Sequence, residues 1–367
     1  MKPLFISAAL LSCATNANVL DNLPDNYAFA TKADFINAVE FNIKKDWIQL
    51  ISGEIIFGEL EELLDDEIFF DSDDLGYLVI DLEDVARINS HSPKTIHLLK
   101  FGTFSGAFSF DGDMIVIGDQ MFRKASKRDI VSITRFASTE SERWENEIGF
   151  GANINSGNNS SKEFTGKMTS LRTEANSRLR MSYLGTVRQD TGGLNSRNHR
   201  FLGSYSIYYS ASYFLRPIAL EMSQSTPQNI KLQSAVSAQV GYDIYNDTER
   251  TWEVSIGPSW VYTKFDTVDE GLNSAGSSLG VSISSFYEMD LGKDIDLSHT
   301  YSLTTNNEAA GGIMHHNLLS LSLDLTEVVE MEVDFVWDRT EKPVAKLNGD
   351  TPKKDDLRLS FGVGIEF

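Results

Sequence analysis

The sequence LRLSFGVGIEF, from Leu357 to Phe367, is the part of the chain that most clearly indicates the fold class. Alternate residues of a β-strand point to opposite faces. One face of this segment is wholly apolar and the other is polar or small, namely Leu357, Leu359, Phe361, Val363, Ile365 and Phe367 against Arg358, Ser360, Gly362, Gly364 and Glu366. A last strand of this kind, ending on Phe, is typical of a bacterial outer-membrane β-barrel. The alternative is the last strand of a soluble β-sandwich.

In a barrel, this strand would also be the signal read by the machinery that inserts barrels into the outer membrane. The residues predicted to carry the signal lie on the apolar face, which would contact outer-membrane lipid: Phe361, Val363, Ile365 and Phe367.

Residues 1–17 have the features of a secretory signal peptide. Lys2 is a minimal positive region, an apolar run follows, and Thr15-Asn16-Ala17 resembles a cleavage site. The sequence Leu10-Leu11-Ser12-Cys13 also resembles a lipoprotein box, so the alternative is an envelope protein anchored through a lipidated Cys13. Cys13 is the only cysteine, and cleavage after Ala17 would leave no thiol or disulfide chemistry. Residues 18–45 form a lead segment, in which residues 31–42 fit a short helix capped by Thr31.

The chain carries a formal net charge of −21. This acidity argues against nucleic acid as a partner. The sequence also lacks the run of about 18 apolar residues that a transmembrane helix needs. Only helices and closed barrels satisfy the backbone in lipid, so a membrane location would require a barrel.

Residues 46–138 read as a tandem β repeat. Ile48-Gln49-Leu50 recurs as Ile96-His97-Leu98, and the stretch that begins at Phe57 recurs at Ser105 with the same offset. Each unit has about 45 residues of short alternating strands with acidic or glycine turns, such as residues 64–67 and 111–113. We expect two SH3-like half-barrels, with Gly58 and Gly106 at bends or bulges. The module would lie in the periplasm and bind peptidoglycan or a periplasmic protein, or else serve as a folded spacer or plug.

Residues 144–367 divide into twelve alternating segments, which predicts an antiparallel transmembrane β-barrel of about twelve strands. The segments run approximately over residues 144–155, 161–171, 176–188, 198–209, 212–223, 230–245, 251–265, 280–291, 294–305, 313–325, 327–338 and 356–367.

The connections between these segments alternate in length. Those after segments 2, 4, 6, 8 and 10 are short, whereas those after segments 3, 7, 9 and 11 are longer and rich in Gly, Asn, Asp and Thr. Bacterial barrels have an even number of strands, short periplasmic turns and longer extracellular loops. The alternation therefore favours a barrel over a sandwich, with both ends of the barrel in the periplasm.

Residues 46–367 resemble a known family, domain of unknown function 481, whose members are often labelled salt-induced outer membrane proteins. The likeness rests on Trp144 followed by Ser156-Gly157-Asn158, on Gly241-Tyr242 and Gly257-Pro258, and on Pro343-Val344 before Asp355-Asp356-Leu357. The preceding repeat, with Ser52-Gly53-Glu54 and Asp84-Val85, resembles a module that often precedes such barrels. The resemblance implies an outer-membrane barrel and no established substrate.

The inward face of the predicted barrel carries opposite charges on two walls. One wall would hold Arg178, Arg180, Arg200 and Arg216, and the other Glu288, Asp290, Asp324, Glu330, Glu332 and Asp334, together with Asp294, Asp296 and Asp338. This pattern fits either a lumen filled by a salt-bridge network or a narrow pore whose transverse field orients ions and small polar solutes. The sequence does not decide between the two.

No catalytic constellation or cofactor motif is evident. His315 and His316 would point to opposite faces of a strand, which disfavours a metal site there. A hydrolase of the outer-membrane phospholipase type would need Ser and Asn beside an outward-facing His299, and the sequence marks neither partner. We therefore predict a non-enzymatic outer-membrane protein without cofactor or metal, either a narrow channel or a structural barrel with an envelope-facing module. The membrane-embedded hydrolase is the alternative.

Overall fold

The structure is a computed structural model that describes residues 45–64, 66–111, 114–118, 120–123, 126–155, 161–190, 195–210, 212–246, 250–268, 273–292, 294–308, 311–326, 328–347 and 349–367. The chain forms two compact units that divide between Ser138 and Thr139. The predicted signal peptide, Cys13, the lead segment up to residue 44 and the helix at residues 31–42 lie outside the described residues. In the described part of the chain, no helix has the length and apolar character needed to cross a membrane.

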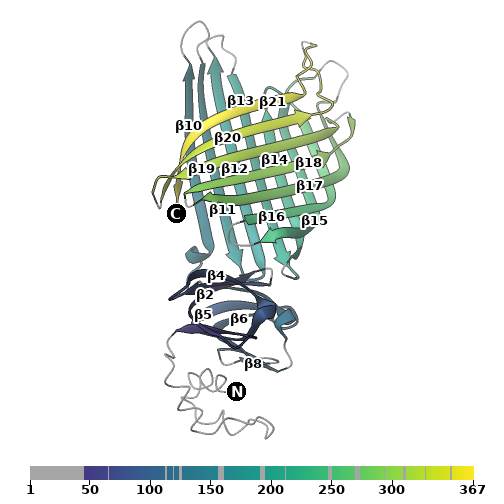
Figure 1. Ribbon diagram of the computed structural model, residues 1–367. Helices are drawn as coiled ribbons and strands as arrows, with labels where there is room; N and C mark the ends of the chain where they lie inside the picture. The colour runs from purple at the N-terminus through teal and green to yellow at the C-terminus, as the bar shows by residue number, and fades with distance from the viewer. Residues whose placement is uncertain are drawn as a thin grey trace, which may run out of the picture. The chain divides into compact units, whose positions relative to one another are not determined.

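The amino-terminal unit is a nine-stranded sheet (Figure 1). Eight strands follow the order β4-β3-β2-β1-β5-β6-β7-β8, and β9 pairs with β2 and β5. The elements are β1 (Asp46–Leu50), β2 (Ile55–Leu64), β3 (Glu67–Ser72), β4 (Gly76–Asp81), η2 (Leu82–Asp84), β5 (Val85–Leu98), β6 (Gly102–Asp111), β7 (Met114–Ile117), β8 (Gln120–Arg123), η3 (Lys127–Asp129) and β9 (Ile130–Arg135). In the turns predicted at residues 64–67 and 111–113, Asp65, Gly112 and Asp113 lie outside the described residues.

Strand β5 is shared by two halves of this sheet. Its first part pairs with β1, where Ile48 lies opposite Ile88, and its last part pairs with β9, where Ile96 lies opposite Ile133. Each half runs through four strands, a short 3-10 helix and a closing strand. The SH3-like identity of the halves stays a prediction.

Both glycines of the predicted repeat lie where two backbones approach closely. A Cβ at Gly58 would lie 2.0 Å from the carbonyl oxygen of Asp71, and one at Gly106 would lie 2.8 Å from the amide nitrogen of Gly118. A larger residue at either position would force the neighbouring strand or turn to move.

The sheet encloses an apolar core. Its members come from both halves, so the halves fold around one another: Ile48, Leu60, Leu63, Ile68, Phe70, Leu82, Val85, Ile88, Ile96, Leu98, Phe108, Phe110, Ile115, Ile117, Ile130 and Ile133. Asp46 is a buried polar exception. Its carboxylate accepts hydrogen bonds from the Leu60 amide at 3.1 Å, the Ser90 hydroxyl at 2.8 Å and the His91 amide at 2.6 Å. These bonds compensate its lost hydration and tie β1 to β2 and β5.

The second unit is a closed barrel of twelve antiparallel strands, β10 to β21, in sequence order. The strands are β10 (Trp144–Asn155), β11 (Ser161–Glu174), β12 (Ser177–Asp190), β13 (Asn195–Tyr208), β14 (Tyr213–Ser225), β15 (Ile230–Asn246), β16 (Arg250–Phe265), β17 (Ala275–Gly292), β18 (Ile295–Thr305), β19 (Ile313–Asp324), β20 (Val329–Thr340) and β21 (Asp355–Glu366). This result confirms the predicted all-β fold with its twelve-stranded antiparallel barrel.

Since twelve strands run alternately up and down, β10 begins and β21 ends at the same end of the barrel, here called the terminal end (Figure 1). The opposite end is called the loop end. The connection of residues 191–194 is shorter than predicted, because β12 and β13 extend to Asp190 and from Asn195. Strand β17 likewise starts five residues before the predicted position 280, at Ala275. Ser156, Gly157 and Asn158 lie outside the described residues.

The barrel is closed by a short seam between β10 and β21. Only five residue pairs form this ladder, from Glu147↔Glu366 to Gly151↔Gly362, whereas β10 pairs with β11 along its whole length. The last residue completes the seam, because Phe367 and Asn146 exchange backbone hydrogen bonds of 2.9 and 3.1 Å.

Strand alternation turns the barrel's apolar side outward. In β21, Leu357, Leu359, Phe361, Val363 and Ile365 are all exposed, and Leu279 of β17 is 84% exposed. The inward positions carry small and polar residues, many of them buried, such as Ser237, Gln239 and Ser255. A barrel that spans a membrane has this arrangement, with an apolar exterior in contact with lipid and polar residues in its interior.

Candidate functional site

The candidate site is the lumen of the barrel, because the alternating strands aim nearly all of its buried charges there. All four predicted arginines lie inside, on β12, β13 and β14. The positive and negative charges are not separated onto two opposite walls, as the sequence analysis predicted. They gather into three groups in the lumen.

The first group centres on Glu253 of β16 and is called the Glu253 cluster, made of Arg178, Arg180, Arg216 and Glu253. Arg216, whose side chain is 4% exposed, donates to Glu253 at 2.7 Å and to the Ser255 hydroxyl at 2.9 Å. Arg180 lies 3.0 Å from the same carboxylate, with its guanidinium 3.8 Å from the centre of the Phe286 ring. Arg178 is more distant, at 3.9 Å from Glu253. Three cations therefore share the Glu253 carboxylate, and the buried Asp243 adds a second negative charge that interacts with all three.

The second group, called the Asp338 layer, crosses the lumen and consists of Arg200, Glu221, His316, Asp338 and Arg358. Arg200 of β13 bonds to Asp338 of β20 at 2.8 Å and also pairs with Glu221. His316 donates to Asp338 at 2.7 Å, and Arg358 donates to its other oxygen. Because at least four strands separate β13 from β20 in either direction around the barrel, this network joins opposite walls.

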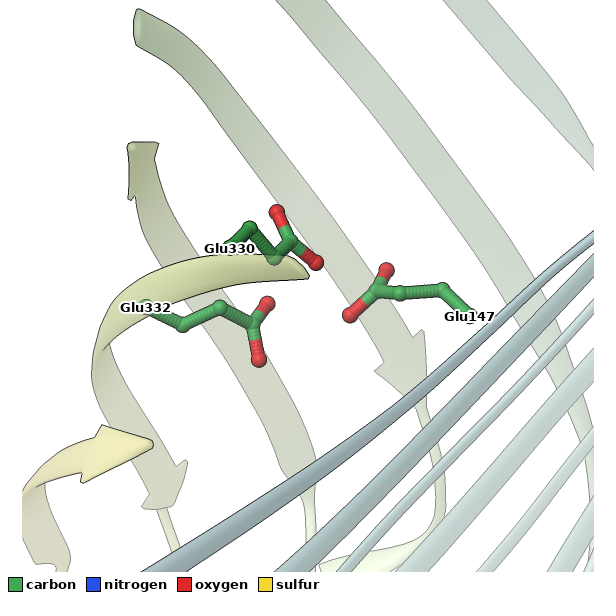
Figure 2. A group of neighbouring side chains, drawn as sticks. All are labelled: Glu147, Glu330 and Glu332. Carbon is green, nitrogen blue, oxygen red and sulfur yellow. The ribbon is translucent and has the colours of Figure 1, made fainter. Parts of the chain in front are cut away.

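The third group, called the Glu332 cluster, consists of Glu147, Glu330, Glu332 and Lys167. Figure 2 shows that the three carboxylates, from β10 and β20, point toward one another, and their nearest oxygens lie within 4.8 Å of each other. The Lys167 ammonium group lies 3.3 Å from Glu147 and in direct contact with Glu332. It therefore supplies the positive charge that a metal ion would otherwise bring, and we interpret the group as an ion-paired cluster.

Two seam glycines make room for these carboxylates. A Cβ at Gly149 would lie 2.6 Å from Oε2 of Glu332, and one at Gly364 would lie 2.4 Å from Oε1 of Glu330. The alternation of glycines with apolar residues in β21 thus serves the lumen as well as the lipid-facing wall.

The remaining predicted acids occupy two different settings. Asp334 is buried and accepts a 2.6 Å hydrogen bond from the Ser320 hydroxyl. Glu288, Asp290 and Asp324 lie near the terminal end and are exposed to solvent. Of the ion pairs between described residues, none includes these three. Asp290 faces Asp296 directly across the β17–β18 ladder, which concentrates uncompensated negative charge at this end.

A cavity of about 410 Å³ occupies the lumen between the terminal end and the Asp338 layer. Its lining runs from Glu145, Glu288 and Glu330 up to Arg200 and His316. Around the layer itself, two pockets measure about 20 and 10 Å³. A pocket that small holds about one water molecule.

Sequence reasoning missed five members of these groups: Glu147, Lys167, Glu221, Glu253 and Arg358. Their inward positions follow from strand alternation. Their partners do not, because an ion pair across the lumen depends on the stagger between distant strands, which local sequence does not fix. Asp338 was assigned to the inward face, although its role as the hub of a layer could not be foreseen.

The histidines of the barrel lie where their positions in the strands predict. His315 and His316 point to opposite faces: His315 bonds to Tyr301 at 2.8 Å and stacks on Trp337, while His316 enters the Asp338 layer. His299 accepts a 2.8 Å hydrogen bond from the Asn317 amide. This His–Asn pair was not predicted, and the β18–β19 register brings its two residues together. The residues directly across from His299 are Tyr287 and Leu319, not a serine.

The four residues of the predicted assembly signal are exposed on the outer wall beside the seam. Phe361, Val363, Ile365 and Phe367 are 45–68% exposed. Val363 and Ile365 lie opposite Phe150 and Ile148 of β10. Recognition of this strand by the insertion machinery stays a prediction.

Comparison with known proteins gives a family and several solved barrels. The model of the family described as "Protein of unknown function, DUF481" matches residues 148–367. None of the curated proteins that were compared matches the chain. Among solved structures, the NanC porin is similar with 10% identity and a TM-score of 0.36, covering 61% of this chain and 98% of the porin.

Two further structures show the same kind of likeness. The KdgM porin has 8% identity and a TM-score of 0.31, covering 61% of this chain and 98% of its own. OccK11 (OpdR) of Pseudomonas aeruginosa has 7% identity and a TM-score of 0.27, and the match covers 61% of this chain and 94% of OccK11. TM-scores this low assign no function.

Proposed function

This chain belongs to the DUF481 family of proteins of unknown function, and we propose that it is a non-enzymatic outer-membrane β-barrel with a narrow lumen that rests closed. The observation that carries the proposal is the Asp338 layer. Arg200 spans the lumen between Glu221 and Asp338, and Arg358 and His316 complete the network from the far wall. A layer of this kind fills the cross-section with paired charge and leaves no water-filled path.

The chamber below the layer gives the lumen a preference for cations. Its lining includes Glu288 and Asp324, which take part in none of the ion pairs between described residues, whereas Arg180, Arg200 and Arg216 are held by carboxylates. Carboxylates concentrated in a confined space attract cations and repel anions. When the layer opens, the barrel should therefore pass small cations rather than anions. If the layer never opens, the barrel is a structural element of the envelope.

The position of the barrel in the envelope follows from its exterior. The apolar outer wall supports contact with outer-membrane lipid, and the terminal end would face the periplasm, where the amino-terminal unit would lie. A partner of that unit, either peptidoglycan or a periplasmic protein, stays a prediction. The described strands of this unit carry no catalytic constellation that would suggest a chemical role.

Planar-bilayer recording on the purified protein tests the proposal. The native protein should conduct rarely, and Arg200→Ser should raise conductance, because it leaves Glu221 and Asp338 facing each other without their shared cation. The current should favour K⁺ over Cl⁻. Arg188→Ser is the matched control, because Arg188 pairs with Asp190 on the exposed part of β12, outside the layer. Frequent, large native conductance would contradict a closed lumen.

A second function, a hydrolase on the outer wall, is favoured by one observation, the His299–Asn317 pair. The serine that would complete a catalytic triad is not opposite His299, and the hydroxyl of the nearby outward residue Ser285 accepts a hydrogen bond from Trp252 at 3.1 Å. Lipid hydrolysis by the purified barrel that disappears in both His299→Ala and Ser285→Ala would establish the enzyme. Activity retained in either variant, or absent from the native protein, would leave the non-enzymatic function.

A further inference from the structure

At the loop end of the barrel, three connections between strands are joined by hydrogen bonds. The centre of these bonds is Asn229, the last residue of the turn between β14 and β15. Asn229 has a left-handed backbone conformation, with φ of 61°, and is 1% exposed. A polar residue so fully buried at the mouth of a barrel requires hydrogen-bond partners, and those partners show what the turn holds.

Asn229 bonds to two other connections at the loop end. Its amide group donates to the carbonyl of Thr267 at 2.7 Å and to the carbonyl of Val344 at 3.3 Å. Its side-chain oxygen accepts from the amide of Thr267 at 3.1 Å and from the hydroxyl of the same residue. Its backbone carbonyl accepts from the amide of Asp266 at 3.0 Å. One side chain therefore joins the β16–β17 and β20–β21 connections to its own turn.

The neighbouring residue Gln228 extends this arrangement toward the lumen. It is 6% exposed, and its side chain accepts from the Thr340 hydroxyl at 3.1 Å and donates to the carbonyl of Asp338 at 3.4 Å. Thr304 of β18 lines the same small pocket as Gln228 and is 5% exposed, although it lies only one residue from the end of its strand. The turn and Thr304 therefore lie close together at the loop end.

We propose that residues 226–229, 266–267 and 340–344 form a single hydrogen-bonded lid over the lumen, and that the side chain of Asn229 is its latch. The lid rests on the proposed function, because it would close the outer side of the same pathway that the Asp338 layer closes further in. The pathway then has two closures in series, and a solute from the loop end must pass the lid before it meets the layer.

Cysteine labelling in the full-length protein tests the lid without depending on conductance. Cys13 is the only native cysteine, so an introduced cysteine in the barrel is identified by mass spectrometry of its own peptide. Thr304→Cys reports access beneath the lid to a charged, water-soluble maleimide. Ser298→Cys, which lines the large cavity on the terminal side of the layer, reports access from the other end.

The latch is removed by Asn229→Gly, because glycine keeps the left-handed backbone without strain and deletes only the side-chain hydrogen bonds. Since each lost bond is worth about 1 kcal/mol and 1.4 kcal/mol is tenfold in an equilibrium constant, labelling of Thr304→Cys should accelerate about tenfold or more. Labelling of Ser298→Cys should not change. Asn229→Asp keeps the acceptor for Thr267 but buries a carboxylate oxygen against the carbonyls of Thr267 and Val344, so it should accelerate labelling at least as much as Asn229→Gly.

The outcomes separate the lid from the closed lumen. Equal labelling of Thr304→Cys with and without Asn229 would overturn the lid, as would parallel acceleration at Ser298→Cys, which would indicate general loosening of the barrel. Heat-modifiable migration on a gel verifies that each variant is folded. If Asn229→Gly alone conducts freely while the Asp338 layer is intact, the lid stands and the layer is not the closure of the resting lumen.

Discussion

In the amino-terminal unit, the largest fully buried side chains include Phe69, Phe70, Phe108 and Phe110, whereas the fully covered side chains in the barrel are mostly serine, glutamine and charged residues. Two sheets built from the same alternating pattern thus bury opposite faces. The difference lies in the surroundings. A sheet in water stabilises itself by removing apolar surface from solvent, and a sheet in lipid must remove polar groups from hydrocarbon. Alternation alone therefore does not tell which face is the interior.

The largest effect should follow from a cavity in the apolar core of the amino-terminal unit. Phe70 is fully buried, and Phe70→Ala should cost about 3–5 kcal/mol of the unfolding free energy of this unit. Leu75→Ala is the control, since Leu75 is 66% exposed. Denaturant unfolding measured on both variants should show a large loss only for Phe70→Ala, with the heat-modifiable migration of the barrel unchanged. A similar loss in both variants would contradict the assigned core.

The barrel should respond most strongly to charge on its outer wall. Phe361→Arg places a cation on the lipid-facing side near the middle of β21, at a cost of about 2–4 kcal/mol, and should sharply reduce the amount of folded barrel in membranes. Leu357→Arg puts the same charge near the loop end of the strand, where the cost falls to about 0–1 kcal/mol. Quantifying heat-modifiable protein in outer-membrane fractions compares the two. Equal membrane levels of both variants would argue against a lipid-facing wall.

Removal of Phe367 tests the assembly signal separately from charge. The residue is exposed, but its backbone completes the seam with Asn146. Its deletion should lower the fraction of inserted barrel more than Phe367→Leu, which keeps the backbone bonds and an apolar side chain. Pulse-labelled protein followed into the membrane fraction measures this. Normal insertion of the deletion variant would show that the terminal residue is dispensable.

A smaller effect is expected from the polar interior of the barrel. Arg216→Met leaves Glu253 with Arg180 as its remaining close partner, and loss of the charged hydrogen bonds should cost about 1.5–3 kcal/mol. The double variant Arg216→Met/Glu253→Met also removes the carboxylate that Arg216 paired with. However, Arg178 and Arg180 lose their shared partner and the buried Asp243 remains, so stability should recover only in part. Thermal denaturation in detergent measures both. A double variant less stable than Arg216→Met would show that depriving Arg178 and Arg180 of Glu253 costs more unfolding free energy than depriving Glu253 of Arg216.

The smallest effect is a pH dependence confined to the amino-terminal unit. Hydrogen bonds from Lys100 and from the amide of Ser126 hold the pKa of Asp129 below its usual value. A carboxyl whose pKa is lower in the folded state stabilises the fold above its unfolded pKa of about 3.9, and this contribution is lost as the pH falls through the folded value. Asp129→Asn should therefore flatten the acid side of the stability profile. If the unfolding free energy of the variant depends on pH as that of the native unit does, Asp129 does not contribute to the pH dependence.

The alternating segments predicted the barrel well because each strand of a barrel repeats the same local rule. The strand count, the outward face of β21 and the inward charges all follow from period two. The predicted ends of the strands were less accurate. Strand β17 starts at Ala275, because the small polar residues that precede Gly280 resemble a loop in sequence but continue the ladder with β16.

The partners of the lumen charges could not be predicted in the same way. Arg200 meets Asp338 only because the barrel closes with a particular stagger, and Asn317 meets His299 only through the register of β18 and β19. Each contact depends on the closed barrel as a whole. The contacts within the site therefore could not be predicted from the sequence, although the inward positions of most of its residues could be.

The seam between β10 and β21 has a consequence for the order in which the barrel assembles. Its five residue pairs provide far fewer backbone bonds than any ladder between consecutive barrel strands, and Gly149, Gly151, Gly362 and Gly364 on its inner side contribute no side-chain packing. Hydrogen–deuterium exchange should therefore be fastest along this line, because the least bonded ladder opens at the lowest free energy. The two edges that meet there are the most distant in the sequence of the barrel, so they should also join last. The carboxylate of Glu332 reaches its place beside Gly149 only after that final step.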